Sequence, residues 1–177
     1  LGGDGVFAGC TIQITDSVGN PSNVLIVPTF EVDTVVAVVS TITTTDSDLN
    51  GTVDTATIIF SDEVNDASFT GATFTVEGSS AVFSTGSIAN DNTIVLSVAG
   101  LVGTNAKVVA YSAGSGTDLA GNTLSFFSST SLDGAAPVLL SAITTSTTTL
   151  DVVFSEDLDG GTVNPSGSEF AVAGATI

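Results

Sequence analysis

The sequence predicts an all-β protein made of tandem copies of one unit. Thr (27), Val (23), Ser (22) and Gly (19) make up about half of the 177 residues, and these residue types favour strands and turns. Lys, Arg, Met and Gln, which favour helices, together number two, and Glu numbers five. Several short strings also recur about 100 residues apart, which indicates a repeat.

The repeated strings divide the chain into one complete unit and parts of two others. D-S-V-G-N at 16–20 recurs as D-L-A-G-N at 118–122, and each copy precedes an apolar strand that leads to a lone Asp, Asp33 or Asp133. Three further alignments pair 38–43 with 139–144, 58–64 with 152–158, and 74–78 with 170–174. We therefore expect closing strands of a preceding unit in 1–32, a complete unit in 33–134, and opening strands of a following unit in 135–177.

Within the complete unit, alternating apolar residues and turn signals place seven strands. They are expected near 35–43, 53–61, 72–77, 81–85, 93–99, 106–112 and 123–130. Seven short strands at this spacing are typical of an immunoglobulin-like sandwich, although the Cys–Trp–Cys signature of antibody domains is absent. The alternation predicts a core of Val53, Ile58, Phe60, Phe74, Val76, Ile94, Leu96, Val98, Val108, Ala110, Leu124 and Phe126.

The two partial units should expose apolar faces unless something covers them. We expect the following side chains to be buried by residues outside the complete unit: Ile12, Ile14 and Leu25 at one end, and Val152 and Phe154 at the other. The covering residues would belong to a longer chain or to neighbouring copies joined head to tail, and the longer chain is favoured.

The same strings resemble a known group of bacterial proteins. A strand ending F-S-[DE]-[DE]-[VL], followed by F-T-V-x-G, N-T-I-V-L-S-V-A-G-L and D-L-A-G-N-T-L, is similar to the bacterial Ig-like repeats of S-layer proteins and large surface adhesins. The resemblance covers nearly all of the chain and implies tandem Ig-like β-sandwiches. Such modules serve as spacers, lattice units or binding heads, and the family has no catalytic residues to carry over.

The composition limits the chemistry that the chain can perform. There is no His or Arg, so no imidazole is present for acid–base catalysis or zinc binding and no guanidinium for phosphate. No Ser has a partner base, and although Asp and Glu are plentiful, nothing singles out a carboxylate pair for hydrolysis. A formal net charge of −18 repels nucleic acid and anionic membranes, and no apolar run reaches the length of a membrane span. We therefore expect no enzyme. Cys10, the single cysteine, should lie on the core face of a strand.

The string D-S-D-L-N-G-T-V-D at 46–54 predicts a calcium loop. Oxygen-bearing residues at alternate positions, with Gly51 at the sixth, let the chain wrap around one hard cation. The expected ligands are Asp46, Asp48, Asn50, the backbone carbonyl of Thr52, and Asp54. Thr57 stands where an EF-hand carries Glu, so the loop is only EF-like, and Asp62 and Glu63 are weaker candidates for the last ligand.

The alignment of the repeats supports this interpretation. Thr43 and Phe60 are 17 positions apart, whereas Thr144 and Phe154 are 10 apart, so seven residues that carry the ligand pattern are inserted. Two other interpretations stay open. One is a turn rich in Asp and Asn whose carboxylates are solvated, and the other is N-glycosylation at Asn50-Gly51-Thr52, which would remove Asn50 as a ligand.

The remaining ionisable residues carry simpler expectations. Asp16 and Asp118 should only start the turn in D-x-x-G-N, whereas Asp33 and Asp133 in the linkers either start turns or share a cation between units. Alternation in the strand near 106–112 predicts that Lys107, the only base, points outward.

These features predict a non-catalytic structural segment of a secreted or cell-surface protein, such as an S-layer, extracellular fibre or adhesin stalk, stiffened by calcium. Its expected partners are other Ig-like repeats of the same protein or of neighbouring copies, with glycans or a host or cell surface as further options. The alternatives are an accessory or glycan-binding module of a secreted polysaccharide-degrading enzyme, and a virion decoration or fibre domain. Glycan binding would call for exposed Trp or Tyr, and the chain has no Trp and one Tyr.

Overall fold

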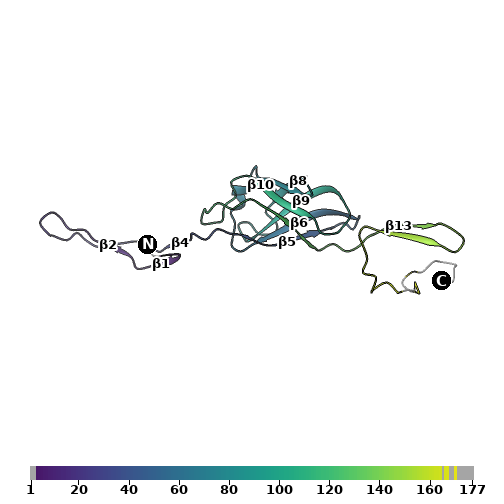
Figure 1. Cartoon of the computed structure of the whole chain (residues 1–177). Coiled ribbons are helices and arrows are strands. Elements are labelled where there is room, and N and C mark those ends of the chain that lie inside the picture. The colour runs from purple at the N-terminus through teal and green to yellow at the C-terminus, as the bar shows by residue number, and fades with distance from the viewer. Residues whose placement is uncertain (1–2, 165, 168–169, 171–177) are drawn as a thin grey trace.

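The computed structural model describes residues 3–164, 166–167 and 170, and it is all-β. The described residues contain no α-helix, only one short 3-10 helix, η1 (Asp66–Phe69). Figure 1 shows three parts in a row: short strands at the N-terminal end, a middle part that holds the core, and a hairpin toward the C-terminal end. The prediction of an all-β protein is therefore confirmed.

The N-terminal part consists of two small antiparallel sheets. β1 (Gly5–Phe7) pairs with β4 (Phe30–Val32), and β2 (Thr11–Ile12) pairs with β3 (Leu25–Ile26). Phe7 stacks on Phe30 across the first pair, with ring centroids 5.4 Å apart. Within this chain Ile12, Ile14 and Leu25 are exposed, and Cys10 is half-buried. Their burial by further residues stays a prediction about a longer chain or an assembly.

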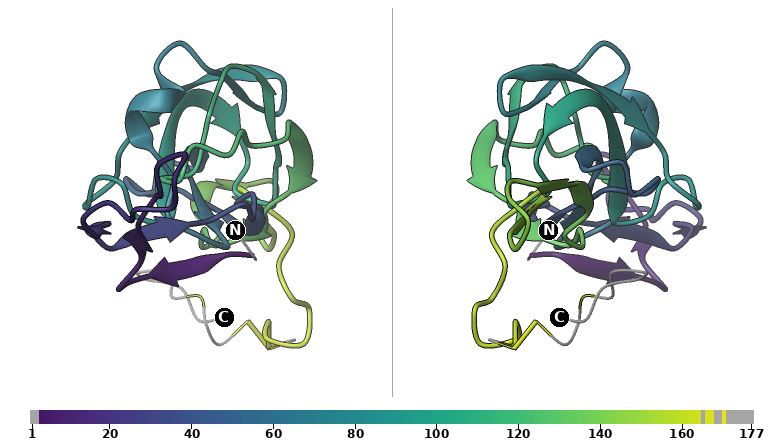
Figure 2. Two further views of the ribbon diagram at one scale, coloured as in Figure 1. Left: turned by 90° about the vertical axis from the view of Figure 1, so that its left-hand side faces the viewer. Right: turned by 90° about the vertical axis from the view of Figure 1, so that its right-hand side faces the viewer.

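The middle part is one eight-stranded sheet that curves until its two edges come near each other. Its strands are β5 (Val39–Thr45), β6 (Thr52–Phe60), β7 (Thr73–Val76), β8 (Ser79–Ser84), β9 (Thr93–Val102), β10 (Val108–Ala113), β11 (Phe127–Thr130) and β12 (Leu132–Asp133). The order across the sheet is β11-β10-β7-β8-β9-β6-β5-β12. Because β8 pairs with both β7 and β9, it joins the two halves, and the edge strands β11 and β12 follow each other in the chain. Figure 2 shows the strands wrapped around a common interior, as in a nearly closed barrel.

Local sequence explains how these strands begin and end. Glu77 and Gly78 both adopt positive φ, 48° and 76°, and join β7 to β8 directly after the pair Val76↔Ser79. Two central residues with positive φ form the turn whose twist matches that of a hairpin, and Gly adopts this conformation without strain. All seven predicted strands are present, and β12 is an additional short one.

The core lies inside the middle part. Nine predicted core residues are buried: Val53, Ile58, Phe60, Phe74, Val76, Ile94, Leu96, Val98 and Leu124. Phe69, on η1 rather than on a strand, lies at the centre of an aromatic cluster with ring centroids 5.4 to 6.3 Å from those of its neighbours Phe60, Phe74, Phe83 and Tyr111. Aromatic contacts at these distances add to the hydrophobic stabilisation of the core.

The predicted orientation of β10 was wrong by one residue. Val109 and Tyr111 are buried, whereas Val108 is 40% exposed and Ala110 only half-buried. Phe126, also assigned to the core, is 59% exposed, and its ring packs edge-on against Tyr111 with centroids 5.1 Å apart. Residues 108–111 are apolar or aromatic at every position, so alternation could not choose between the two faces, and a slip of one residue exchanges them.

The C-terminal hairpin repeats the first hairpin of the middle part. β13 (Leu139–Thr144) pairs with β14 (Leu150–Phe154) as β5 pairs with β6, and both pairs carry a register shift at their first positions. Ser61 and Ser155 make matching bonds, since each Oγ accepts the amide of Val38 or Val138, at 3.0 and 2.8 Å. Val152 and Phe154 are half-buried.

This pairing corrects the alignment drawn from the strings. Val39 pairs with Phe60 and Leu139 with Phe154, so 39 matches 139, one position away from the alignment of 38 with 139. The connection 46–54 then corresponds to 146–148, and the inserted residues number six rather than seven. The expected later strand at 170–174 lies largely outside the described residues, since 171–174 are not described.

Candidate metal centre

The loop predicted to bind calcium connects the ends of β5 and β6. The hydroxyl groups of Thr45 and Thr55, which face each other in the sheet, are hydrogen-bonded and close the base of the loop. Gly51 has φ 85° and turns the chain back toward β6. A residue with a Cβ would be strained in this left-handed conformation, which is why the sixth position of such loops favours Gly.

Asp46 is the first residue of the loop, directly after β5, and the most buried of its three aspartates. It is only 6% exposed, and its carboxylate accepts the amides of Gly51 at 2.8 Å and Asn50 at 3.2 Å. Burial alone would raise the pKa of Asp46, but the hydrogen bonds from Gly51 and Asn50 outweigh it and hold the pKa below its ordinary value. Asp46 therefore stays ionised, as a cation ligand must.

Asp48, Asn50 and Thr52 follow at alternate positions and bond one to the next. The Asn50 side-chain amide donates to Asp48 Oδ2 at 3.0 Å. Asn50 Oδ1 accepts the amide and the hydroxyl of Thr52, at 2.8 and 2.5 Å. These hydrogen bonds fix the side chains of Asp48 and Asn50, two of the predicted ligands. The same bonds are also typical of a turn rich in Asp and Asn. Asn50 is exposed, so the glycosylation interpretation also stays open.

Asp54 completes the group from the start of β6. Its carboxylate accepts the amide and hydroxyl of Ser47, both at 3.0 Å. Asp46, Asp48 and Asp54 each offer a carboxylate oxygen, and these atoms lie within 4.8 Å of one another. Calcium binds oxygens at about 2.3–2.6 Å, so ligand atoms spaced up to about 5 Å apart suit one ion. Three carboxylates with a neighbouring amide oxygen therefore fit a hard cation.

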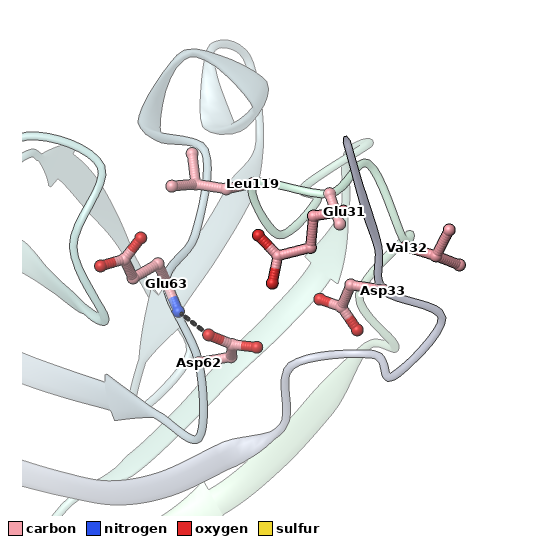
Figure 3. A pocket seen from close by; sticks show the side chains of 7 residues that line it. Glu31, Val32, Asp33, Asp62, Glu63 and Leu119 are labelled. Atoms are coloured by element: carbon pink, nitrogen blue, oxygen red, sulfur yellow. Dashed lines mark hydrogen bonds between the residues drawn. The ribbon is translucent and has the colours of Figure 1, made fainter. Parts of the chain in front are cut away.

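The two weaker candidates for this loop lie elsewhere. Asp62 and Glu63 line a recess of about 550 Å³ at the end of the middle part that faces β4, together with Glu31, Asp33, Val32, Leu119 and Ala120. Figure 3 shows the Glu31, Asp33 and Asp62 side chains around this recess, with the Glu63 amide donating to Asp62 at 2.8 Å. Neither residue belongs to the group formed by Asp46, Asp48 and Asp54.

Asp16 and Asp118 make the same turn in two parts of the chain. Each carboxylate accepts the amide and the side-chain amide of the Asn four residues on: at 2.9 and 2.9 Å for Asn20, and at 2.8 and 3.0 Å for Asn122. Hydrogen bonds from the Asn20 side chain and then its backbone lower the pKa of Asp16. These bonds fit the turn-starting role expected for both aspartates. Asp33 and Asp133 likewise each accept the amide two residues on, at 2.9 and 3.1 Å.

The prediction that Lys107 points outward was wrong. Lys107 is 6% exposed, and its ammonium donates to Asn105 Oδ1 at 2.8 Å and the Val102 carbonyl at 3.4 Å. It lies on the face opposite to the one predicted because the whole strand is turned by one residue. A buried ammonium needs hydrogen-bond acceptors, and the last residue of β9 and the turn before β10 supply them.

Sequence reasoning also missed a carboxyl pair next to Lys107. Glu156, just after β14, lies near Asp133. Burial of Glu156 and then its contact with Asp133 raise the pKa of Glu156, while Thr104 and Lys107 act in the opposite direction. Asp133 and Glu156 are 23 residues apart in the sequence and meet only because the hairpin folds back on the middle part, so no local pattern could have indicated the pair.

Comparison of the chain with protein-family models, curated proteins and solved structures found no match. In the part of the chain that the structure describes, no helix is long and apolar enough to cross a membrane.

Proposed function

We propose that the chain is a non-catalytic structural segment of a secreted or cell-surface protein, built from Ig-like β-sandwich repeats that calcium stiffens. The observation that carries the proposal is the recurrence of the same hydrogen bonds in successive parts of the chain. The turn at Asp16 recurs at Asp118. The hydrogen bond from the Val38 amide to Ser61 Oγ recurs between Val138 and Ser155. A chain of like units in a row sets distances between its ends, which is the task of a stalk, fibre or lattice.

Composition and geometry support a mechanical role. The charge of −18 with one base keeps such a segment soluble and makes cation binding favourable. Tyr111, the single Tyr, is 1% exposed, so it offers no platform for a sugar ring, and this favours the structural role over glycan binding. The same mechanical argument applies whether the segment belongs to an S-layer, an adhesin, a fibre or a virion. We place the protein outside the cell, among copies of its own repeat.

Calcium is the proposed structural ion, held by Asp46, Asp48, Asn50, Thr52 and Asp54. The buried, ionised Asp46 and its proximity to two further carboxylates support this assignment. Binding to the folded state alone stabilises it by mass action.

Calorimetric titration of the metal-stripped protein with calcium tests the proposal. We expect saturable heat in the wild type and in Asp151→Ala, a matched control that removes one exposed aspartate from β14. Asp48→Ala should lose the heat. Absence of saturable heat in the wild type, or its persistence in Asp48→Ala, would contradict the metal site.

The structural role has a separate test in the shape of the protein in solution. We expect small-angle scattering to show an extended particle whose maximum dimension shifts little with protein concentration and is better defined in calcium than in chelator. A compact particle under both conditions would contradict the role as a spacer. Specific binding to an array of polysaccharides would favour the accessory-module alternative instead.

A further inference from the structure

Asn50 is the only asparagine in the chain that is followed by glycine. In such a pair the backbone nitrogen of the glycine can attack the side-chain carbonyl carbon of the asparagine, because glycine has no Cβ to hinder the approach. The reaction converts asparagine into aspartate or isoaspartate without an enzyme. The Asn50 side chain is exposed, so water can reach it. Asn50 and Gly51 therefore form a candidate site of covalent self-modification.

This reaction needs no reagent other than water. The Gly51 nitrogen loses its proton and bonds to Asn50 Cγ, while the bond from Cγ to Nδ2 breaks and ammonia leaves with that proton. Water then opens the cyclic imide at either of its two carbonyl groups. One opening gives aspartate, and the other gives isoaspartate, whose side chain has become part of the backbone. Either product adds a negative charge and about 1 Da, because OH replaces NH2.

A hydrogen bond lowers the reactivity of the Gly51 nitrogen. This nitrogen donates to Asp46 Oδ2 at 2.8 Å, and Asp46 is only 6% exposed. The nitrogen attacks after it has lost its proton, and a carboxylate beside it disfavours the anion that would form. The closed loop therefore holds the Gly51 nitrogen in its protonated, unreactive form.

The Asn50 side chain is held at both of its polar atoms. Nδ2 donates to Asp48 Oδ2 at 3.0 Å, and Oδ1 accepts the Thr52 amide at 2.8 Å. These bonds restrict rotation of the side chain, and the first of them must break when ammonia leaves. The fold thus restrains the carbon that is attacked as well as the nitrogen that attacks it.

The hairpin β13–β14 covers Gly51. The residue is buried, and a Cβ placed on it would lie 2.5 Å from Leu140 Cδ2 and 3.4 Å from Ser155 Cβ. Ser155 is fixed at this place because its Oγ is hydrogen-bonded to that of Thr104, a fully buried residue, at 2.7 Å. These contacts dock the hairpin on the middle part. Hydroxide therefore reaches the Gly51 amide when Leu140 moves away.

We propose that Asn50 is a modification site that stays unreacted while the hairpin β13–β14 is docked and deamidates when the hairpin detaches. Detachment exposes the Gly51 amide and frees it to leave Asp46. Because ammonia is lost, the change does not reverse, and the product accumulates with the time that this junction spends open. The proposal goes beyond the structural role and does not depend on a bound cation.

Mass spectrometry of the unglycosylated chain, incubated in chelator at mildly alkaline pH, tests the proposal. Peptide mapping assigns the gain of about 1 Da to Asn50. We expect this gain to be at least about ten-fold slower in the folded protein than in the protein unfolded by denaturant, because the reaction requires local opening. Equal rates in the two states, or no reaction at Asn50 in the unfolded chain, would overturn the proposal.

A disulfide separates docking from the rest of the fold. Thr104→Cys with Ser155→Cys, in a Cys10→Ser background, leaves only these two cysteines in the chain. Side-chain oxygens 2.7 Å apart place the two sulfurs within reach of a bond of about 2.05 Å. The oxidised protein should deamidate at least about five-fold more slowly than the same protein reduced, because the hairpin cannot detach. Equal rates, or failure of the disulfide to form under mild oxidation, would overturn the role of docking.

Truncation of the side chain that covers Gly51 gives a second test without cysteines. Leu140→Ala should speed deamidation of the folded protein by about three-fold or more, because local opening becomes easier. Ile143→Ala is the matched control, because Ile143 is exposed on the same strand, three positions farther along β13. An unchanged rate in Leu140→Ala, or an equal increase in both variants, would contradict the inference.

Discussion

The hairpins β5–β6 and β13–β14 have the same strand register, the same register shift and the same hydrogen bond from a valine amide to a serine hydroxyl. They differ in how deeply their side chains are buried. Ile58 and Phe60 on β6 are buried at 0% and 2% exposure, whereas Val152 and Phe154 at the matching positions of β14 are only half-buried. The cause is their neighbours. β9 pairs along the other edge of β6, and β14 has no such strand among the described residues. Local pattern is therefore enough to form the hairpin, but burial requires the rest of a sheet.

The largest expected effect comes from truncating the side chains at one matched position of the two hairpins, Ile58 on β6 and Val152 on β14. Ile58→Ala should destabilise the middle part by about 2–5 kcal/mol, the usual cost of truncating a fully buried aliphatic side chain. Val152→Ala at the equivalent position should cost less than about 1 kcal/mol, because the half-buried side chain leaves no closed cavity. Chemical denaturation followed by circular dichroism measures both. Equal costs would show that β14 is covered in solution by residues of another copy.

Several strands of the middle part could be predicted because they carry a clear alternation of apolar and polar residues. Phe74 and Val76 on β7 alternate with Thr73, Thr75 and Glu77, and both are buried as expected. The alignment of 38–43 with 139–144, which was drawn from matching strings, agrees with the register of the two hairpins to within one residue. A period of two is a strong local signal when one face of a strand is buried.

The remaining features depend on contacts that no local pattern encodes. Around β10 every position from 108 to 111 is apolar or aromatic, so the sequence could not show that Val109 and Tyr111 face inward. Phe69 enters the core from a 3-10 helix and escapes a search for alternation. The composition of the acidic loop was evident, but its contact with Leu140 depends on where the next hairpin lies.

The two hairpins also differ in the connection between their strands, and exchanging this connection should change the stability by an intermediate amount. Replacing 46–54 with Ser-Thr-Thr, the residues at 146–148, should keep β5 and β6 paired from Thr45↔Thr55 onward and abolish calcium binding, although it also removes the first residues of β6 and the buried Val53. At calcium concentrations about 100-fold above the dissociation constant, the wild type should gain about 2.7 kcal/mol from the ion and the variant nothing. Thermal melts in calcium and in chelator test this, and they should be compared at one ionic strength because salt also screens the acidic surface. A variant that still gains stability from calcium would place the site elsewhere.

The smallest expected effect concerns the end of β14, where Glu156 meets Asp133. The pKa of Glu156 is raised in the folded protein, first by burial and then by Asp133, so folding favours its protonated form. Its contribution to stability is therefore fully present below the ordinary glutamate pKa of about 4.3 and is lost as the pH rises through the raised value. Glu156→Gln, which keeps the shape without the charge, should match the wild type near pH 4. It should be more stable toward pH 7, by about 0.5 kcal/mol, in the range of partly exposed charge pairs.

The measurement is the free energy of unfolding across this pH range. Asp157→Asn serves as the control, since it removes the same charge one residue further along, where the side chain is exposed. A difference between Glu156→Gln and the wild type that does not change with pH, or an equal one in Asp157→Asn, would contradict a specific contact between the hairpin and the middle part at this position.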